Sequence, residues 1–80
     1  MQNQETKREI ENFMYNIAWL RRQNKLSKRK MAELLKVSVQ SLNKIESGNM
    51  PMGISMNVFF LVQKHFGVHP ADQLRKRLGE

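Results

Sequence analysis

Residues 39–47 carry polar side chains at the spacing of a single helical face. Four of them recur at i, i+3, i+4 and i+7: Gln40, Asn43, Lys44 and Ser47. The apolar Leu42 and Ile45 fall on the opposite side, so one face of such a helix can be buried while the other meets water. A carboxamide both donates and accepts hydrogen bonds, and an ammonium group only donates. A rigid row of such groups can recognise the edge of a nucleic-acid base, although an ordinary solvated helix face has the same spacing.

Two short helices joined by a sharp turn are predicted between Ser27 and Gly48. Apolar residues fall at helical spacing in two runs: Met31, Leu34 and Leu35, then Leu42 and Ile45. Only residues 36–38 separate the two helices, which leaves room for a turn and nothing longer. Ser27 and Ser38 are typical N-cap residues, and Gly48 is typical of the position just beyond a helix C-terminus. The small Ala32 allows the two helices to cross closely.

The order of these residues resembles the helix-turn-helix of the phage repressor and Cro class, also called Cro/C1-type or XRE-like. The resemblance extends from about Phe13 to Leu74 and depends on the following residues: Leu26-Ser27, Ala32, Val37-Ser38, Leu42 and Ile45-Glu46-Ser47-Gly48. Two positions depart from the family pattern, because Lys28 stands where glutamine is usual and Lys36 stands where the turn usually has glycine. A lysine in a left-handed turn costs roughly 1 kcal/mol, so we expect a slightly strained turn that still forms.

The resemblance implies that the second motif helix enters the major groove of double-stranded DNA, where the positions of Val39, Gln40 and Lys44 contact bases. The chemistry of these side chains agrees, since Gln40 can pair with adenine, Lys44 can donate to guanine, and Val39 offers methyl groups to thymine. Asn43 has the same chemistry as Gln40 and lies on the same face. We therefore add Asn43 to the predicted base-reading residues.

Phosphate contacts are expected at the start of the first motif helix, where Lys28 adjoins backbone amides that lack helical acceptors. Further candidates flank the motif: Ser38, Ser47, Asn49, Arg22 and Lys25. Family members often hold phosphates with basic residues in the loop after the second motif helix. Residues 49–53 contain no basic residue, so we expect backbone amides to make this phosphate contact instead. The family also pairs an arginine late in the first helix with the glutamate that ends the second motif helix, which implies a structural ion pair between Arg21 and Glu46.

The balance of charge points to an anionic partner. The 80-residue chain has a net charge of +7 and a pI near 10.3. Residues 21–36 contain seven basic side chains against the single acidic Glu33, so the charge is concentrated around the first motif helix. A solvated basic face is the alternative. The absence of cysteine excludes disulfides and is typical of a cytoplasmic protein, and the sequence shows neither a membrane span nor a signal peptide.

A longer helix is predicted to precede the motif, over residues 9–23. Its apolar stripe consists of five residues: Ile10, Phe13, Met14, Ile17 and Leu20. Residues 1–8 are polar and are interpreted as a flexible arm or an extension of this helix. Tyr15 and Trp19 lie four residues apart on the other side, where a helix buried on one face would leave them in water. We expect either the N-terminal arm or a partner to cover them.

A fourth helix is predicted over residues 55–66, and a fifth begins at Pro70, behind an N-cap at His69, and runs through Leu78. In the fourth helix one set of apolar residues is expected to face inward: Met56, Phe59, Phe60, Val62 and Phe66. A second stripe occupies its other side: Val58, Leu61 and His65. This second stripe, together with the last helix, is the predicted dimer surface, and the pair Tyr15 and Trp19 is the rival surface.

Together these elements predict a compact all-α orthogonal bundle of five helices, with one domain over residues 9–78 and the motif at residues 27–48. The predicted function is sequence-specific binding of double-stranded DNA by a transcriptional regulator, a repressor. One module contacts only a few base pairs, so a homodimer on a near-palindromic site is expected. A protein-interaction adaptor or antitoxin-like subunit of the same fold is the alternative, and RNA binding is a third interpretation.

No enzymatic site is predicted. His65 and His69 have the i, i+4 spacing of metal ligands, but Gly67 and Pro70 interrupt the helix around them, so a zinc site is not expected. The sequence shows no nucleophile–base pair and no phosphate-cradling glycine motif. Neither a cofactor nor a small-molecule substrate is therefore predicted.

Overall fold

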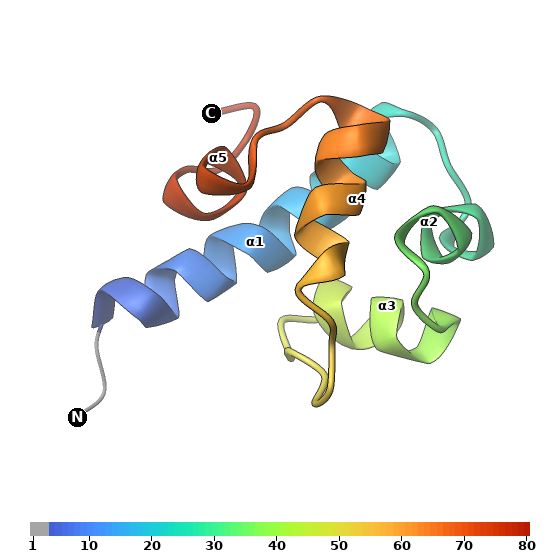
Figure 1. The fold of residues 1–80 in the computed structure, drawn as a ribbon, viewed down its shortest axis with the longest axis horizontal. Coiled ribbons are helices and arrows are strands. Elements are labelled where there is room, and N and C mark those ends of the chain that lie inside the picture. The colour runs from blue at the N-terminus through green and yellow to red at the C-terminus, as the bar shows by residue number, and fades with distance from the viewer. Residues whose placement is uncertain (1–3) are drawn as a thin grey trace.

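The computed structural model describes residues 4–80, and this part of the chain contains five α-helices and no strand (Figure 1). In chain order the helices are α1 (Gln4–Gln23), α2 (Lys28–Leu35), α3 (Val39–Glu46), α4 (Asn57–Phe66) and α5 (Pro70–Arg75). In Figure 1 the long α1 passes behind the steeply crossing α4, with α2 and α3 on one side of the molecule and α5 on the other. The all-α bundle predicted from the sequence is confirmed.

The apolar core is formed by side chains from the first four helices. Its most fully buried apolar members are Phe13, Ile17, Met31, Leu35, Leu42, Ile45, Val58 and Val62. The rings of Phe13 and Phe59 pack with 4.6 Å between their centroids, which ties α1 to α4. Because α3 contributes Leu42 and Ile45 from one side only, its opposite side remains at the surface.

Helix α1 begins at Gln4, so residues 4–8, which the sequence left open as a flexible arm or a helix extension, are part of the helix. Its predicted apolar stripe is buried at four of five positions, but Ile10 is 37% exposed. The inclusion of Ile10 in the core is therefore wrong. Ile10 lines a surface hollow between α1, α4 and α5 instead.

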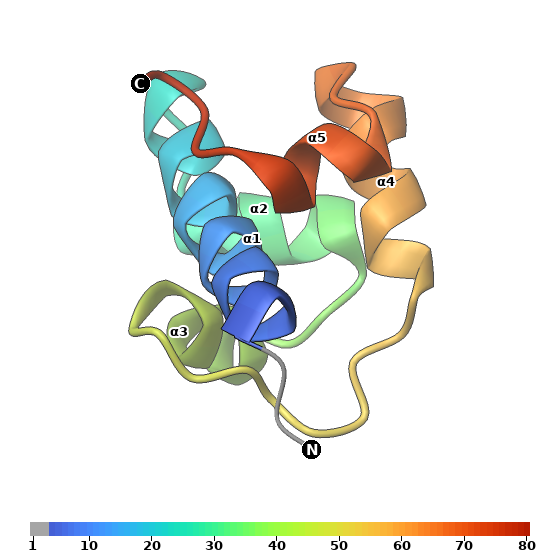
Figure 2. The same cartoon turned by 90° about the vertical axis from the view of Figure 1, so that its left-hand side faces the viewer.

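Helix α5 ends at Arg75, three residues before the predicted end at Leu78, because α1 side chains intercept its backbone hydrogen bonds. The amide of Leu78, which an α-helix would direct to the Leu74 carbonyl, donates instead to Asn16 Oδ1 over 2.8 Å. The Leu74 carbonyl accepts from Asn12 Nδ2 at 2.9 Å. Asn16 Nδ2 also donates to two carbonyls of the C-terminal segment, those of Gln73 and Lys76. The segment consequently leaves the helix and runs back along α1 (Figure 2).

This C-terminal segment covers the two aromatic residues that the sequence leaves unexplained. The guanidinium of Arg77 lies 5.0 Å from the ring centroid of Tyr15, and a Cβ atom on Gly79 would lie 2.5 Å from Trp19 Nε1. Tyr15 and Trp19 are therefore only partly exposed. The prediction that an N-terminal arm or a partner covers them was wrong, because the C-terminal segment does so. The rival Tyr15/Trp19 dimer surface stays a prediction, at two side chains that are only partly exposed.

Helix α4 faces the core with a side that only partly matches the predicted one: Val62 is fully buried and Phe59 and Phe66 pack against the core as expected, but other positions differ. Val58 is 2% exposed and Leu61 is 8% exposed, whereas Met56 and Phe60 are 72% and 59% exposed. The helix begins at Asn57, whose amide donates to Ser55 Oγ, and Met56 lies before its first turn. Since Val58 and Leu61 belong to the core of one chain, they are not a dimer surface, and the face assignment for Met56 and Phe60 was also wrong. His65 is exposed on the outer side of the same helix.

Candidate nucleic-acid interface

Both ends of α3 are closed by local hydrogen bonds. Ser38 is the predicted N-cap, and its Oγ accepts from the Ser41 amide over 3.0 Å. At the other end Gly48 adopts a positive φ of 89°, and the Asn49 amide reaches back to the Lys44 carbonyl over 2.8 Å. The helix therefore has a defined length and direction despite having only eight residues.

The two sides of α3 are sharply different. Leu42 and Ile45 are fully buried against α1 and α2. The predicted base-reading side chains are all exposed on the opposite side: Val39, Gln40, Asn43 and Lys44. The structure thus brings these four together in one outward row that no other described part of the chain covers.

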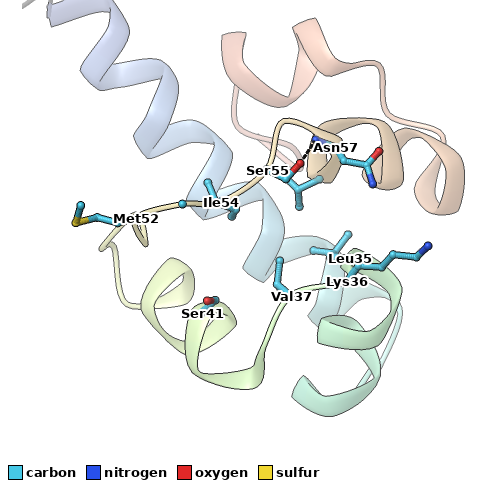
Figure 3. Close-up of a pocket in the computed structure, with 10 residues that line it drawn as sticks. Leu35, Lys36, Val37, Ser41, Met52, Ile54, Ser55 and Asn57 are labelled. Carbon is cyan, nitrogen blue, oxygen red and sulfur yellow. Dashed lines mark hydrogen bonds between the residues drawn. The ribbon is translucent and has the colours of Figure 1, made fainter.

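The turn between α2 and α3 has the left-handed geometry that the sequence predicts. Lys36 has φ 56° and ψ 43°, and the Val37 amide donates to the Ala32 carbonyl over 3.0 Å. A cavity of about 210 Å³ lies between this turn and residues 52–57 (Figure 3). In Figure 3 the Lys36 side chain extends away from Ser41 and Met52, so its ammonium group does not fill this cavity. The cavity has no charged side chain directed into it from the turn.

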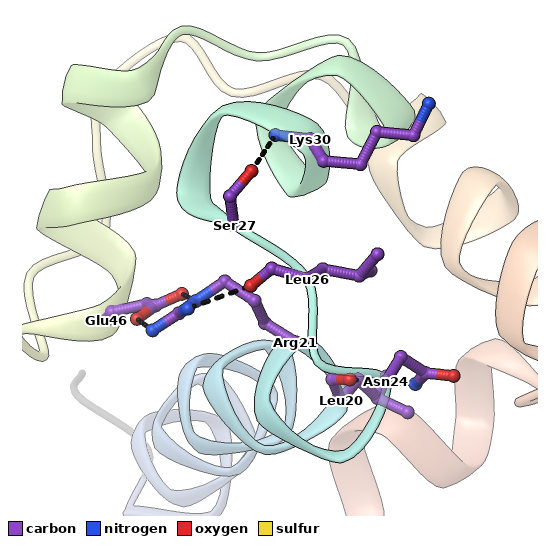
Figure 4. Close-up of polar contacts among 7 residues, drawn as sticks. All are labelled: Leu20, Arg21, Asn24, Leu26, Ser27, Lys30 and Glu46. Atoms are coloured by element: carbon purple, nitrogen blue, oxygen red, sulfur yellow. Dashed lines mark hydrogen bonds and ion pairs between the residues drawn. The ribbon is translucent and has the colours of Figure 1, made fainter.

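An ion pair fixes the C-terminal end of α3 to α1 (Figure 4). The Arg21 guanidinium donates to both carboxylate oxygens of Glu46, with Nε to Oε2 at 2.6 Å and Nη2 to Oε1 at 3.0 Å. A third donor, Nη1, reaches the Leu26 carbonyl at 3.1 Å and so holds the connection before α2. The hydrogen bonds to Glu46 raise the pKa of Arg21 above its ordinary value, which outweighs the opposing effect of burial. Arg21 therefore remains charged, and the pair implied by the resemblance is present.

The start of α2 offers backbone amides beside a basic side chain. Ser27 Oγ accepts from the Lys30 amide at 3.1 Å, and the Ser27 carbonyl accepts from the Met31 amide. The amides of Lys28 and Arg29 have no acceptor among the described residues, and both of these side chains are exposed. This helix end therefore retains the donors that a phosphate oxygen requires.

The other candidate phosphate ligands differ in how free their donor groups are. Arg22 and Lys25 are exposed and carry their charges at the surface. The Ser38 hydroxyl donates to Ser41 Oγ at 3.0 Å, and the Ser47 hydroxyl donates to the Lys44 carbonyl at 3.0 Å. A phosphate would have to compete with these internal bonds. Asn49 is exposed, and the only hydrogen bond of its side chain within the described chain is a long one of 3.5 Å to Ser47 Oγ.

One basic residue that the sequence interpretation missed lies beside the loop after α3. Lys7, in the first turns of α1, lines a surface hollow of about 310 Å³ together with Gly48, Asn49 and Met50. The loop itself contains no basic residue, so Lys7 supplies a positive charge where the loop has none, although Glu11 lines the same hollow. The sequence left residues 1–8 open as a flexible arm or an extension of the first helix, and it is the helical course of residues 4–8 that brings Lys7 to this position.

Neither histidine lies in a recognisable metal site. Among residues 4–80 no group of three or more histidine, cysteine, aspartate or glutamate side chains is arranged to hold a metal ion. His69 has a structural role, because its Nδ1 accepts from the Ala71 amide at 3.1 Å as the N-cap of α5. In the same part of the chain, no helix has the length and apolarity needed to cross a membrane.

Comparison with known proteins gives one result. A family model described as helix-turn-helix matches residues 17–73, from the second half of α1 into α5. Neither the curated proteins nor the solved structures that were searched include a match. The matched span contains the α2–turn–α3 unit, the Arg21–Glu46 pair and the exposed row of α3.

Proposed function

The chain belongs to the Cro/C1-type helix-turn-helix family of DNA-binding transcription regulators, and we propose that it is a cytoplasmic repressor that binds a near-palindromic operator as a homodimer. The observation that supports this proposal is the exposed row of α3, held from behind by Leu42 and Ile45 and at its end by Arg21. A rigid helix with a polar outer side is what the major groove of DNA can accept. No catalytic step is part of this function.

Two groups of residues have different tasks in this proposal. The outward row of α3 reads bases: Val39, Gln40, Asn43 and Lys44. Lys28 and the first amides of α2 hold a phosphate and so fix the position of the protein without selecting a sequence. Further phosphate ligands are proposed around them: Arg22, Lys25, Ser38, Ser47, Asn49 and Lys7. Because the hydroxyls of Ser38 and Ser47 already donate within the chain, we expect the cationic members of this group to contribute most.

The separation of reading from holding can be tested by selecting bound sequences from a random duplex pool. Gln40→Ala and Lys44→Ala should relax the selected motif, with losses at single base pairs of about 1–3 kcal/mol. Lys28→Ala should weaken binding to all sequences alike. Lys64→Ala is the matched control, because it removes one exposed charge from α4, outside residues 27–48. A uniform loss in Gln40→Ala, Lys44→Ala and Lys28→Ala would contradict the division of tasks.

Salt dependence separates DNA binding from the alternative of a protein-interaction adaptor. Affinity for a random duplex should fall steeply between two salt concentrations, since each phosphate contact releases bound counterions. Lys28→Ala should reduce the slope of log affinity against log salt by about one, whereas Lys64→Ala should leave it unchanged. Absence of duplex binding even at low salt would favour the adaptor or antitoxin-like function, in which DNA binding is lost.

A further inference from the structure

A surface hollow of about 450 Å³ lies between α1 and the end of α3. A second side of it consists of residues 45–48, where α3 ends. Arg77 of the C-terminal segment, residues 76–80, forms a third side. The first side is a single face of α1, because the residues that line it there are spaced three or four apart: Glu11, Met14, Tyr15, Ala18 and Arg22. The hollow therefore adjoins the base-reading helix but takes one wall from the far end of the chain.

The charges around this hollow favour an anion. Arg22 and Arg77 are exposed there, and so is the carboxylate of Glu11. The other carboxylate, that of Glu46, already accepts two hydrogen bonds from Arg21, at 2.6 and 3.0 Å, so this pair is neutral as a unit. Two guanidinium groups thus face one further carboxylate, and the hollow retains a positive charge.

The backbone on both sides of Arg77 is fixed by α1. Asn16 Nδ2 donates to the Lys76 carbonyl at 2.8 Å, and Asn16 Oδ1 accepts from the Leu78 amide at 2.8 Å. Because Asn16 is 1% exposed, its side chain cannot turn to water instead. In Figure 2 the segment that carries Arg77 runs from α5 to the end of α1 drawn in cyan. Arg77 consequently projects from an ordered backbone.

The Arg77 side chain is held as well, but its two terminal nitrogens are free. Nε donates to Asn12 Oδ1 at 3.3 Å, and the guanidinium carbon lies 5.0 Å from the centroid of the Tyr15 ring. Neither Nη1 nor Nη2 has an acceptor among residues 4–80. A guanidinium fixed in this way presents its Nη pair as a planar fork, which can bind two oxygens of one phosphate. Little side-chain entropy remains to be lost on binding.

We propose that Arg77, together with Arg22, holds a phosphate of the DNA strand that passes the end of α3. The major groove is bordered by phosphate backbones, and this cationic hollow lies beside the helix that enters the groove. The backbone amides of Ser47 and Gly48 cannot hold the phosphate, because they already donate to carbonyls of α3, at 3.0 and 3.1 Å. Side chains must therefore supply the donors.

This contact is an addition to the helix-turn-helix, since Arg77 lies outside residues 17–73, which the family model matches. The inference rests on the proposed DNA binding and adds a phosphate ligand to it. Asn16 has a positioning role, because it fixes the backbone from which Arg77 projects.

The salt dependence of binding to a duplex of random sequence tests the role of Arg77. Arg77→Met keeps the apolar stem of the side chain and should lower the slope of log affinity against log salt by about one, the change expected for one lost phosphate contact. Lys76→Met is the matched control, because it removes an equal charge from the adjoining exposed position, which does not line the hollow. Its slope should be that of the wild type.

A variant that moves Arg77 without removing a charge separates the effect of position from the effect of charge. Gly79 has φ 85°, and a Cβ atom there would lie 2.5 Å from Trp19 Nε1, so Gly79→Ala should displace the end of the segment. Trp19 is the single tryptophan of the chain, and a red shift of its fluorescence reports the displacement. The salt slope should then fall by about one although the net charge stays +7. Asn16→Leu, where it folds by circular dichroism, should act in the same way.

Two results would overturn the inference. One is a folded Arg77→Met variant whose salt slope equals that of the wild type. The other is an equal loss of slope in Arg77→Met and Lys76→Met, which would show that the segment acts only through its general charge. The proposed function fails in a different way, because the wild type would then show no duplex binding even at low salt, and this inference would fall with it.

Discussion

Helices α3 and α4 are consecutive in the chain and both carry apolar residues at helical spacing, yet the sequence predicts the orientation of only one of them. In α3 the two residues expected to be buried, Leu42 and Ile45, are fully buried, and the polar row faces outward. In α4 the expected orientation is reversed at Val58 and Leu61, which are buried, and at Phe60, which is exposed.

The difference arises from the number of apolar stripes on each helix. Helix α3 has one apolar stripe and one polar side, so burial of its apolar residues has a single solution. Helix α4 has apolar residues around most of its circumference, with Val58, Leu61 and Val62 on one side and Met56 and Phe60 on another. Its orientation is decided by packing against α2 and α5 rather than by its own pattern. The remaining apolar side, with Met56 and Phe60, is left exposed.

The largest expected effect tests whether α3 is held as described. Leu42→Ala should lower the free energy of unfolding by about 3 kcal/mol, because it creates a cavity beneath a helix of only eight residues. Asn43→Ala, one position further along on the exposed side, should change it by less than about 0.5 kcal/mol. Urea denaturation of both variants measures the difference. If both variants changed the free energy of unfolding by the same small amount, the burial of Leu42 would not be what holds α3 in place.

A second pair of substitutions tests the reversed orientation of α4. Leu61→Ala should lower the free energy of unfolding by about 2–3 kcal/mol, since Leu61 belongs to the core. Phe60→Ala should lower it by less than about 0.5 kcal/mol, since the Phe60 side chain is mostly exposed. A larger loss of stability in Phe60→Ala than in Leu61→Ala would support the orientation that the sequence pattern favours.

The helix-turn-helix itself could be predicted from the sequence because its signals are local. The N-caps at Ser27, Ser38 and His69 and the left-handed Lys36 all lie within three residues of the groups they affect. The Arg21–Glu46 pair joins residues 25 apart, and only the family resemblance implied it.

The C-terminal segment could not be predicted, because its contacts are distant in sequence and polar. Asn16 holds backbone groups 57 to 62 residues away, and Asn12 holds one 62 residues away. An asparagine in the middle of an amphipathic helix ordinarily indicates a surface position, and nothing local reveals that backbone carbonyls will meet it. The covering of Tyr15 and Trp19 follows from these contacts, and so does the early end of α5.

The Arg21–Glu46 ion pair ties α3 to α1, and the described part of α4 has no such pair. Removal of this pair should have the next largest effect on stability. Arg21→Met keeps the packing of the side-chain stem but leaves the largely buried Glu46 carboxylate without its partner, so we expect a loss of about 2 kcal/mol. Lys30→Ala breaks the exposed 3.6 Å contact with Glu33 and should cost less than about 0.5 kcal/mol. Thermal unfolding monitored by circular dichroism compares the two variants.

The pH dependence of the pair follows from the pKa of Arg21. Since that pKa is higher in the folded chain than in the unfolded one, the stabilisation from the charged guanidinium is fully present below the unfolded value, far into the alkaline range, and is lost only as the pH rises through the folded one. The difference in stability between the wild type and Arg21→Met should therefore stay constant from neutral to mildly alkaline pH. A difference that disappears within this range would show that another group controls the anchor.

The smallest expected effect concerns the C-terminal ends of α2 and α4. Helix α4 ends at Gly67 with φ 73°, whereas α2, which leads into α3, ends at Lys36 with φ 56°. Lys36→Gly should therefore raise the free energy of unfolding by about 0.5–1 kcal/mol, because it relieves the steric cost of a Cβ in the left-handed region. Gly67→Ala should lower it by a similar amount, since nothing lies within 4 Å of the added Cβ and only the backbone conformation opposes it.

Thermal unfolding of both variants tests whether the two helix ends obey the same conformational rule. If Lys36→Gly fails to stabilise the chain while Gly67→Ala destabilises it, contacts of the Lys36 side chain must offset the strain of the turn. Duplex binding of Lys36→Gly then distinguishes a role in folding from a role at the DNA, because loss of a phosphate contact reduces the salt slope whereas relief of strain does not. The strain would in that case persist because the positive charge at the turn is needed for binding, and the departure from glycine at Lys36 would have a functional cause.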